Sequence, residues 1–161
     1  GWKRAYLACG SNMGDRESYL NKAVQELEED NKCRVVKVSD WMDTTPYGGV
    51  EQDNFLNGAI AIDTLYTPEE LLEFLHEVEK KNDRERIVHW GPRTLDLDIL
   101  LYEGCVLHTE KLTIPHIDMH NRDFVLKPLR QIAPYEMHPV LGKSVVQLYE
   151  EVKRNGEKHT V

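Results

Sequence analysis

Two aspartates separated by one residue, Asp96 and Asp98, are the side chains whose type and spacing most directly suggest chemistry. They lie in the segment 95–102, where leucine and isoleucine recur at alternate positions and predict a β-strand. Residues two apart on a strand face the same side, with Cα atoms about 6.6 Å apart. Carboxylates at this spacing could hold two divalent cations about 3.5–4 Å apart, the separation used in two-metal phosphoryl chemistry.

The residues just before this strand favour a phosphate site over the simpler explanation, an exposed strand that happens to carry two acids. Gly91 and Pro92 predict a rigid corner, because proline fixes φ and glycine permits unusual dihedrals. Arg93 follows the corner, three residues before the first aspartate. Carboxylates for a metal ion beside a guanidinium for phosphate indicate a site for the phosphates of a nucleotide.

A second candidate site lies in the segment 54–62, which also predicts a strand. Phe55 and Asn57 share one face of it. An aromatic ring to stack on and an amide to read an edge suit a flat heterocyclic ligand. A surface asparagine beside a phenylalanine at the rim of the core explains the same pair equally well.

A third polar cluster, at 114–124, contains His116 and Arg122, and both could contact phosphate. A lone histidine is more often structural than functional. The net charge of −8 argues against general binding to nucleic acid or to a membrane surface, which needs a basic footprint. An anionic ligand must therefore meet a local group of cations, for which the candidates are Arg84, Arg86, Arg93 and Arg122.

The bulk composition predicts one ordinary globular domain that spans residues 1–161. The three cysteines are widely spaced and form no zinc pattern, which suits a reducing compartment. No apolar run approaches the roughly 18 residues of a membrane span. We therefore expect a cytoplasmic protein without a membrane partner.

The elements that would position these residues follow from hydrophobic periodicity and turn signals. They are a strand at 3–9, a turn at 10–14, a helix capped by Asp15 and ending near 30, strands at 34–41 and 54–62, and a helix at 67–81 that begins with a capping box of Thr67 and Glu70. The strand at 95–102, a hairpin at 105–113, and helices at 124–132 and 144–153 follow. The long connection at 43–53 predicts a ligand loop. The order β-α-β-β-α-β predicts an α+β fold, a ferredoxin-like sandwich with extra C-terminal helices.

Several of these motifs, taken together and in order, resemble the 6-hydroxymethyl-7,8-dihydropterin pyrophosphokinases, and the likeness extends over nearly the whole chain. The run from Trp90 through Gly-Pro-Arg-Thr-Leu-Asp-Leu-Asp to Ile99 is highly specific to that family. The other matching motifs are Gly10-Ser11-Asn12, Phe55-Leu56-Asn57, Pro115-His116, Asn121-Arg122 and Phe124. The family transfers pyrophosphate from ATP to the hydroxymethyl group of a dihydropterin in folate synthesis and releases AMP.

The resemblance implies a role for each candidate residue. Asp96 and Asp98 would bind two Mg²⁺ ions that bridge the phosphates of ATP, the co-substrate. Arg84 and Arg93 would clamp phosphate and stabilise developing charge. The further ATP contacts would be Arg122 and His116, with Ile99, Lys111, Thr113, Leu72, His76 and Glu79 near the nucleotide and metal.

The pterin pocket follows from the same resemblance. Phe55 and Phe124 would stack on the two faces of the ring, and Asn57 would bind its edge. The backbone around Thr44 and Tyr47 would complete the pocket, and Trp90 would close over it. The next enzyme of folate synthesis would be a protein partner.

The chain also departs from the family pattern at two positions. Phe55 stands where tyrosine is common, which keeps the stacking surface and removes a hydroxyl. Asp83 precedes Arg84 where glycine is frequent, so an acid could stiffen that segment or pair with the arginine.

Two other functions stay open on the residues alone. Another two-metal nucleotidyltransferase or phosphohydrolase would share the aspartate pair, but it has no use for the set Phe55, Asn57 and Phe124. A non-catalytic ferredoxin-like ligand-binding module would have no turnover and would bind Mg-ATP weakly or not at all.

Overall fold

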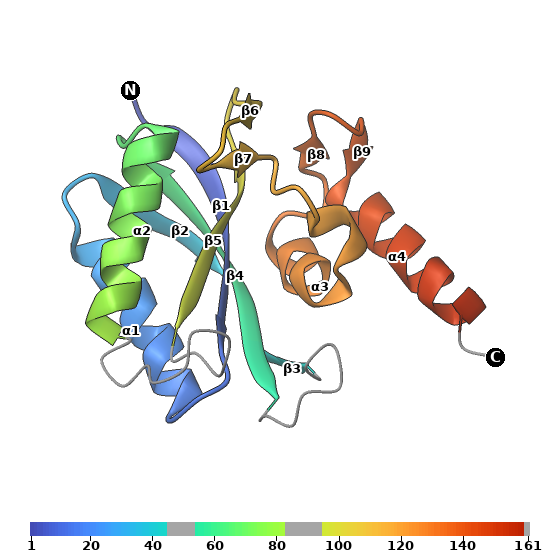
Figure 1. Ribbon diagram of the computed structural model, residues 1–161, viewed down its shortest axis with the longest axis horizontal. Helices are drawn as coiled ribbons and strands as arrows, with labels where there is room; N and C mark the ends of the chain where they lie inside the picture. Colours follow the sequence, from blue (N-terminus) through green and yellow to red (C-terminus); the bar gives the residue numbers. More distant parts are fainter. Residues whose placement is uncertain (45–53, 83–94, 160–161) are drawn as a thin grey trace.

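The central sheet explains how the candidate residues come together. The computed structural model describes residues 1–44, 54–82 and 95–159. The sheet contains β1 (Lys3–Ser11), β2 (Cys33–Val38), β4 (Phe55–Thr64) and β5 (Asp96–Tyr102) in the order β2-β4-β1-β5 (Figure 1). All neighbouring strands are antiparallel, and the short strand β3 (Met42–Thr44) pairs with the beginning of β4. Two predicted site strands, β4 and β5, therefore lie on either side of β1.

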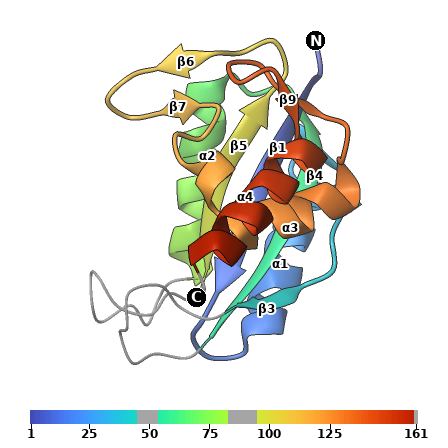
Figure 2. The ribbon, with the colours of Figure 1, turned by 90° about the vertical axis from the view of Figure 1, so that its right-hand side faces the viewer.

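Helices cover both faces of this sheet. Helices α1 (Arg16–Glu29) and α2 (Pro68–Asn82) pack on one face. On the other face α3 (Asp123–Ile132) packs against the sheet, and α4 (Val145–His159) packs against α3 (Figures 1 and 2). The predicted combination of helices with an antiparallel sheet is confirmed.

The two helices on the first face begin where the sequence predicts. The carboxylate of Asp15 accepts a hydrogen bond from the Ser18 N–H at 3.1 Å and caps α1. Before α2, the Thr67 N–H donates to Glu70 Oε1 at 2.9 Å, and the Glu70 N–H donates to Thr67 Oγ1 at 3.2 Å. This reciprocal pair is the capping box that the sequence predicts.

Strand β4 divides the apolar core into two layers by simple alternation. Ile60 and Ile62 pack under α1 and α2, whereas Ala59 and Ala61 face α3 and α4. Alanine adds little bulk, so α3 can lie close to the sheet. This close packing brings the first turn of α3 to the cavity described below.

Strand β5 departs from the predicted alternation at Leu101. Leu7 of β1 pairs with Ile99, but Tyr6 pairs with Leu101, which leaves Leu100 as an extra residue. Beyond this β-bulge the side chains change faces: Leu101 packs in the α3 layer and Tyr102 in the α1 layer. The predicted common face is correct for Leu95, Leu97 and Ile99 and wrong for Leu101.

The C-terminal third adds smaller elements around the second layer. The predicted hairpin is formed by β6 (Leu107–His108) and β7 (Thr113–Ile114), and the 3₁₀ helix η1 (Met119–Asn121) leads into α3. A second hairpin, β8 (Met137–His138) with β9 (Lys143–Ser144), precedes α4. Pro128 lies inside α3, beyond its first turn. Within the described ranges, no helix has both the length and the apolar character that a membrane span requires.

Candidate active site

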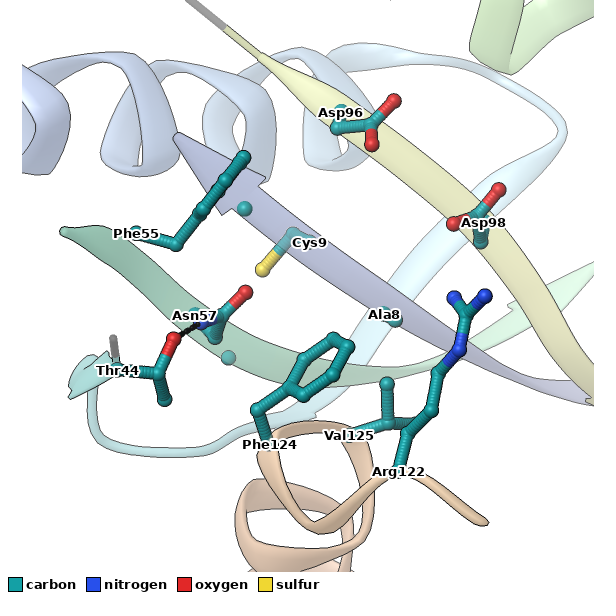
Figure 3. Close-up of a pocket in the computed structure, with 12 residues that line it drawn as sticks. Ala8, Cys9, Thr44, Phe55, Asn57, Asp96, Asp98, Arg122, Phe124 and Val125 are labelled. Atoms are coloured by element: carbon teal, nitrogen blue, oxygen red, sulfur yellow. Dashed lines mark hydrogen bonds between the residues drawn. The ribbon is translucent and has the colours of Figure 1, made fainter. Parts of the chain in front are cut away.

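A cavity of about 220 Å³ lies where β1, β3, β4 and β5 meet the beginning of α3 (Figure 3). Seven of the residues singled out in the sequence line it: Thr44, Phe55, Asn57, Asp96, Asp98, Arg122 and Phe124. They come from four separate elements and the residue before α3, so only the tertiary fold brings them together.

The floor of the cavity is a row of paired residues that runs across three strands. Gly10 of β1 pairs with Asn57 of β4 on one side and with Asp96 of β5 on the other. A Cβ atom on Gly10 would lie 2.9 Å from Asn57 Oδ1 and 3.7 Å from the Phe55 ring. The position therefore needs glycine, because any side chain would displace the asparagine amide.

Asn57 is buried and has a fixed orientation. Its Nδ2 donates to Thr44 Oγ1 at 2.5 Å, and its Oδ1 is the amide atom next to Gly10 (Figure 3). Thr44 is placed by the pairing of β3 with β4, in which it lies opposite Phe55. A carbonyl oxygen directed at the floor can accept a hydrogen bond from an N–H group of a ligand.

Two phenylalanines supply the apolar surface of the cavity. Phe55 from β4 and Phe124 from α3 lie on either side of Asn57 in the close-up view (Figure 3). The guanidinium carbon of Arg122 lies 5.8 Å from the centroid of the Phe124 ring, within cation–π range. A flat ring could stack between such side chains while its edge meets the amide.

The other end of the cavity is acidic on one side and basic on the other. Asp96 and Asp98 project from the same face of β5, as the sequence predicts, and the Arg122 guanidinium points toward Asp98 (Figure 3). Arg122 Nε also donates to Asp118 Oδ2 at 3.2 Å. The hydrogen bond from Asn121 and the nearby arginine lower the pKa of Asp118, so this acid stays ionised and helps to hold the guanidinium.

Glu79 of α2 brings a third acid to the aspartate pair. Its Oε2 accepts a hydrogen bond from the backbone N–H of Leu97, the residue between the two aspartates, at 2.9 Å. Burial raises the pKa of Glu79 to about 8; the Leu97 hydrogen bond opposes this shift, and the charges of Asp96 and Asp98 add to it. The resemblance placed Glu79 near the metal, and the structure places it beside the strand that carries both aspartates.

The carboxylate pair has the donor chemistry that suits Mg²⁺. Carboxylate oxygens are hard ligands, and Mg²⁺ in phosphoryl-transfer sites commonly takes one or two carboxylates together with substrate phosphates. Among the described residues, no group of three or more His, Cys, Asp or Glu side chains could hold a metal ion by itself. Phosphate and water could supply further ligands.

Other predicted site residues lie elsewhere or outside the described ranges. Ile99, Lys111, Thr113 and His116 are not among the described residues that line the cavity. Ile99 is buried in the layer under α1 and α2, and Lys111 and Thr113 belong to the region of the β6–β7 hairpin. The His116 N–H donates to the Leu100 carbonyl at 2.9 Å, which fixes this segment against β5. The residues Tyr47, Arg84, Trp90 and Arg93 lie outside the described residues.

The small residues that form the floor were assigned no site role from the sequence, although Gly10 belongs to a matching motif. Ala8 and Gly10 line the cavity, although the sequence suggested that the strand ends at Cys9 and that Gly10 begins a turn. A glycine close to the end of a predicted strand is a signal for close approach of another group. That signal was present at Gly10 but did not identify which group approaches.

The chain is similar to known proteins over most of its length. The family model of 7,8-dihydro-6-hydroxymethylpterin-pyrophosphokinase (HPPK) matches residues 6–134. The 2-amino-4-hydroxy-6-hydroxymethyldihydropteridine pyrophosphokinase of Bacillus subtilis is 48% identical over 128 residues, which are 80% of this chain and 77% of that protein.

Longer relatives contain a similar region as one part of their chain. The bifunctional protein FolKE of Lactococcus lactis is 44% identical over 89% of this chain, which spans only 42% of that protein's length. A crystal structure of Plasmodium falciparum HPPK-DHPS has the same fold, with a TM-score of 0.80 at 15% identity, over 100% of this chain and 47% of that one. The match to the family model and the similarity to the Bacillus subtilis protein together show that this chain belongs to the 7,8-dihydro-6-hydroxymethylpterin-pyrophosphokinase family.

Proposed function

We propose that this chain transfers pyrophosphate from ATP to the hydroxymethyl group of 6-hydroxymethyl-7,8-dihydropterin, as a step of folate biosynthesis, and releases AMP. The observation that carries the proposal is one cavity with two chemically different ends. Phe55, Asn57 and Phe124 suit a flat heterocycle, and Asp96 and Asp98 suit metal-bound phosphates. Membership of the pyrophosphokinase family supports the same activity.

At the first end, the two phenylalanine rings would enclose the pterin, and Asn57 Oδ1 would accept a hydrogen bond from an N–H on its edge. The bond from Asn57 to Thr44 supports this assignment, because it directs Nδ2 away from the floor. Tyr47 and Trp90 complete the pocket by resemblance to the family. Binding then depends on stacking area and on one well-oriented amide.

At the second end, Asp96 and Asp98 would hold two Mg²⁺ ions against the ATP phosphates. These ions would neutralise phosphate charge and lower the pKa of the attacking hydroxyl. Arg122 would contact phosphate from the opposite wall, with Arg84 and Arg93 as further phosphate ligands. The additional ATP contacts are Ile99, Lys111, Thr113 and His116.

The reaction needs positioning more than covalent help from the protein. The pterin hydroxyl oxygen attacks the β-phosphorus of ATP, the bond from that phosphorus to the α,β-bridging oxygen breaks, and AMP leaves with that oxygen. The hydroxyl proton passes to solvent or to a nearby base. The row Asn57–Gly10–Asp96 supports this in-line arrangement, because it places the heterocycle end and the metal end on the two strands that flank β1, with no side chain between them.

The proposal extends to the organisation of the protein. The strand order β2-β4-β1-β5, with α1 and α2 on one face, supports a ferredoxin-like unit within a single domain that spans residues 1–161. A relative named as a bifunctional protein supports a functional link to another folate enzyme. A direct partner of this kind would be tested by co-purification with that enzyme.

The decisive experiment is a magnesium-dependent assay of AMP release. We expect AMP and the pterin diphosphate to appear only when ATP, Mg²⁺ and the hydroxymethyl-dihydropterin are all present. AMP or another cleavage product without the pterin would instead indicate a different two-metal nucleotidyltransferase or phosphohydrolase. Absence of turnover, together with no binding of a non-hydrolysable ATP analogue in calorimetry, would indicate a non-catalytic module.

A further inference from the structure

Arg16 is the first residue of α1 and is not among the described residues that line the cavity. It contacts the two segments that carry Thr44 and Asn57, which together form one wall of the cavity, the amide wall. Its Nη1 donates to Asp43 Oδ1 at 2.8 Å and to the backbone carbonyl of Asn54 at 2.7 Å. Asp43 belongs to β3, and Asn54 immediately precedes β4. One guanidinium nitrogen therefore joins the beginning of α1 to both segments.

The strand that Arg16 holds is short. Strand β3 consists of three residues, and the only strand pairing described for it is with β4. It carries Thr44, whose hydroxyl accepts the hydrogen bond from Asn57 Nδ2. A short edge strand with few ladder bonds opens easily, so an additional contact at its middle residue, Asp43, changes how well Thr44 is fixed.

The geometry of the contact suits a positioning role better than a general ion pair. The Arg16 and Asp43 side chains are 30% and 61% exposed, and an ion pair at such a site contributes little by Coulomb attraction alone. Nη1 donates to one acceptor on β3 and to one on the residue that precedes β4. A planar guanidinium can fix both acceptors at once, whereas a lysine ammonium acts as a point charge.

Arg16 also connects this wall to the cavity floor. Helix α1 follows β1, which carries Gly10, and the first turn of α1 lies at the same end of the sheet as β3 (Figures 1 and 2). We propose that Arg16 is a positioning residue for the pterin: by joining Asp43 to the Asn54 carbonyl, it keeps Thr44, Phe55 and Asn57 in register with the floor. This inference rests on the proposed function, because it assigns the pterin to this wall.

The test compares ligand binding in Arg16→Gln and Arg16→Lys with the unaltered protein. Calorimetry would measure the dissociation constant of the hydroxymethyl-dihydropterin, with and without a saturating non-hydrolysable ATP analogue and Mg²⁺, and separately that of the analogue. Loss of one or two hydrogen bonds that fix the wall should weaken pterin binding about tenfold in Arg16→Gln. Arg16→Lys should recover part of the loss, and binding of the ATP analogue should stay within about twofold of its original value.

Arg4→Gln is the matched control. Arg4 Nε forms a similar ion pair with Asp63 Oδ1 at 2.7 Å, and its side chain is 37% exposed, but it lies near the other end of β1. We expect this variant to bind both ligands with unchanged affinity. Asp43→Ala should weaken pterin binding less than Arg16→Gln, because the contact with the Asn54 carbonyl remains.

The outcomes separate the inference from the proposed function. Pterin affinity within twofold of the original value in Arg16→Gln would overturn the inference while the unaltered protein still releases AMP. Equal losses for pterin and ATP analogue, or equal losses in Arg16→Gln and Arg4→Gln, would show a merely structural contact and would also overturn it. Failure of the unaltered protein to bind the pterin would overturn both. If Arg16→Gln does not fold, the comparison of Arg16→Lys with Asp43→Ala decides by the same criteria.

Discussion

Asn57 on β4 and Asp96 on β5 lie in the same row of the sheet, and only the backbone of Gly10 on β1 separates them. Neighbouring strands are about 4.8 Å apart, so the two positions are roughly 10 Å apart across the floor. This distance fits a ligand that is held by an amide at one end and reacts near a carboxylate-bound metal at the other.

Removal of either aspartate should strongly slow turnover and leave the pterin site intact. In Asp96→Ala and Asp98→Ala, loss of one charge-stabilising group should lower kcat by about 10²–10³. Pterin affinity, measured by calorimetry on the same preparations, should stay close to that of the unaltered protein. Full activity in either variant would contradict the assignment of the metal site.

The two phenylalanines of the cavity should contribute to pterin affinity and not to nucleotide affinity. Truncation in Phe55→Ala or Phe124→Ala removes stacking and buried area and should weaken pterin binding at least about tenfold. Phe74 is the control, because it stacks on Tyr66 at a centroid distance of 5.2 Å and is not among the described cavity residues. Phe74→Ala should lower thermal stability and leave pterin affinity unchanged. Unchanged affinity in both cavity variants would remove the stacking assignment.

A methyl group on the floor should interfere with pterin binding. In Gly10→Ala the new Cβ would lie 2.9 Å from Asn57 Oδ1, so the amide must move away from its bond with Thr44. We expect weaker pterin binding with a smaller effect on the ATP analogue, both measured by calorimetry. Gly156→Ala in α4 is the control, since nothing lies within 4 Å of a Cβ at that position. Equal affinities in the two variants would show that the floor tolerates a side chain.

Glu79 should make the stability of the metal-free protein fall as the pH rises. Its pKa is raised by burial to about 8, so the folded protein retains a proton that the unfolded chain has already released. The contribution of Glu79 to the free energy of unfolding is therefore complete at a pH below the ordinary pKa of glutamate. It is lost as the pH rises toward 8. Thermal unfolding in the presence of a chelator, from pH 5 to 8, should show a steeper decline for the unaltered protein than for Glu79→Gln. Parallel curves would argue against a buried, protonated Glu79.

The sequence was sufficient to predict most of the helices and strands. It also predicted which residues share a strand face and which residues cap a helix. Alternation along β4 and β5 correctly placed Phe55 with Asn57, and Asp96 with Asp98. The capping box before α2 was predicted from Thr67 and Glu70, because its two bonds join residues three apart in the chain. Interactions of this kind are local and therefore visible in a sequence.

Contacts between distant segments were not predictable in the same way. The short strand β3 was included in a long connection, because three residues carry no clear periodicity. The bond from Leu97 to Glu79 joins an edge strand to a helix, and the contact of Arg16 with Asp43 joins residues far apart in sequence. Each depends on how whole elements pack, which a pattern along one segment does not contain.

The extra residue at Leu100 has a consequence for how the protein can diverge. It separates the half of β5 that carries the aspartates from the half in which Leu101 and Tyr102 have exchanged faces. The Leu100 carbonyl also accepts a hydrogen bond from the His116 N–H. This bond attaches the segment after the β6–β7 hairpin to β5 at this point. Substitutions beyond Leu100, or a longer hairpin, could therefore occur in relatives without a change in the direction in which Asp96 and Asp98 project.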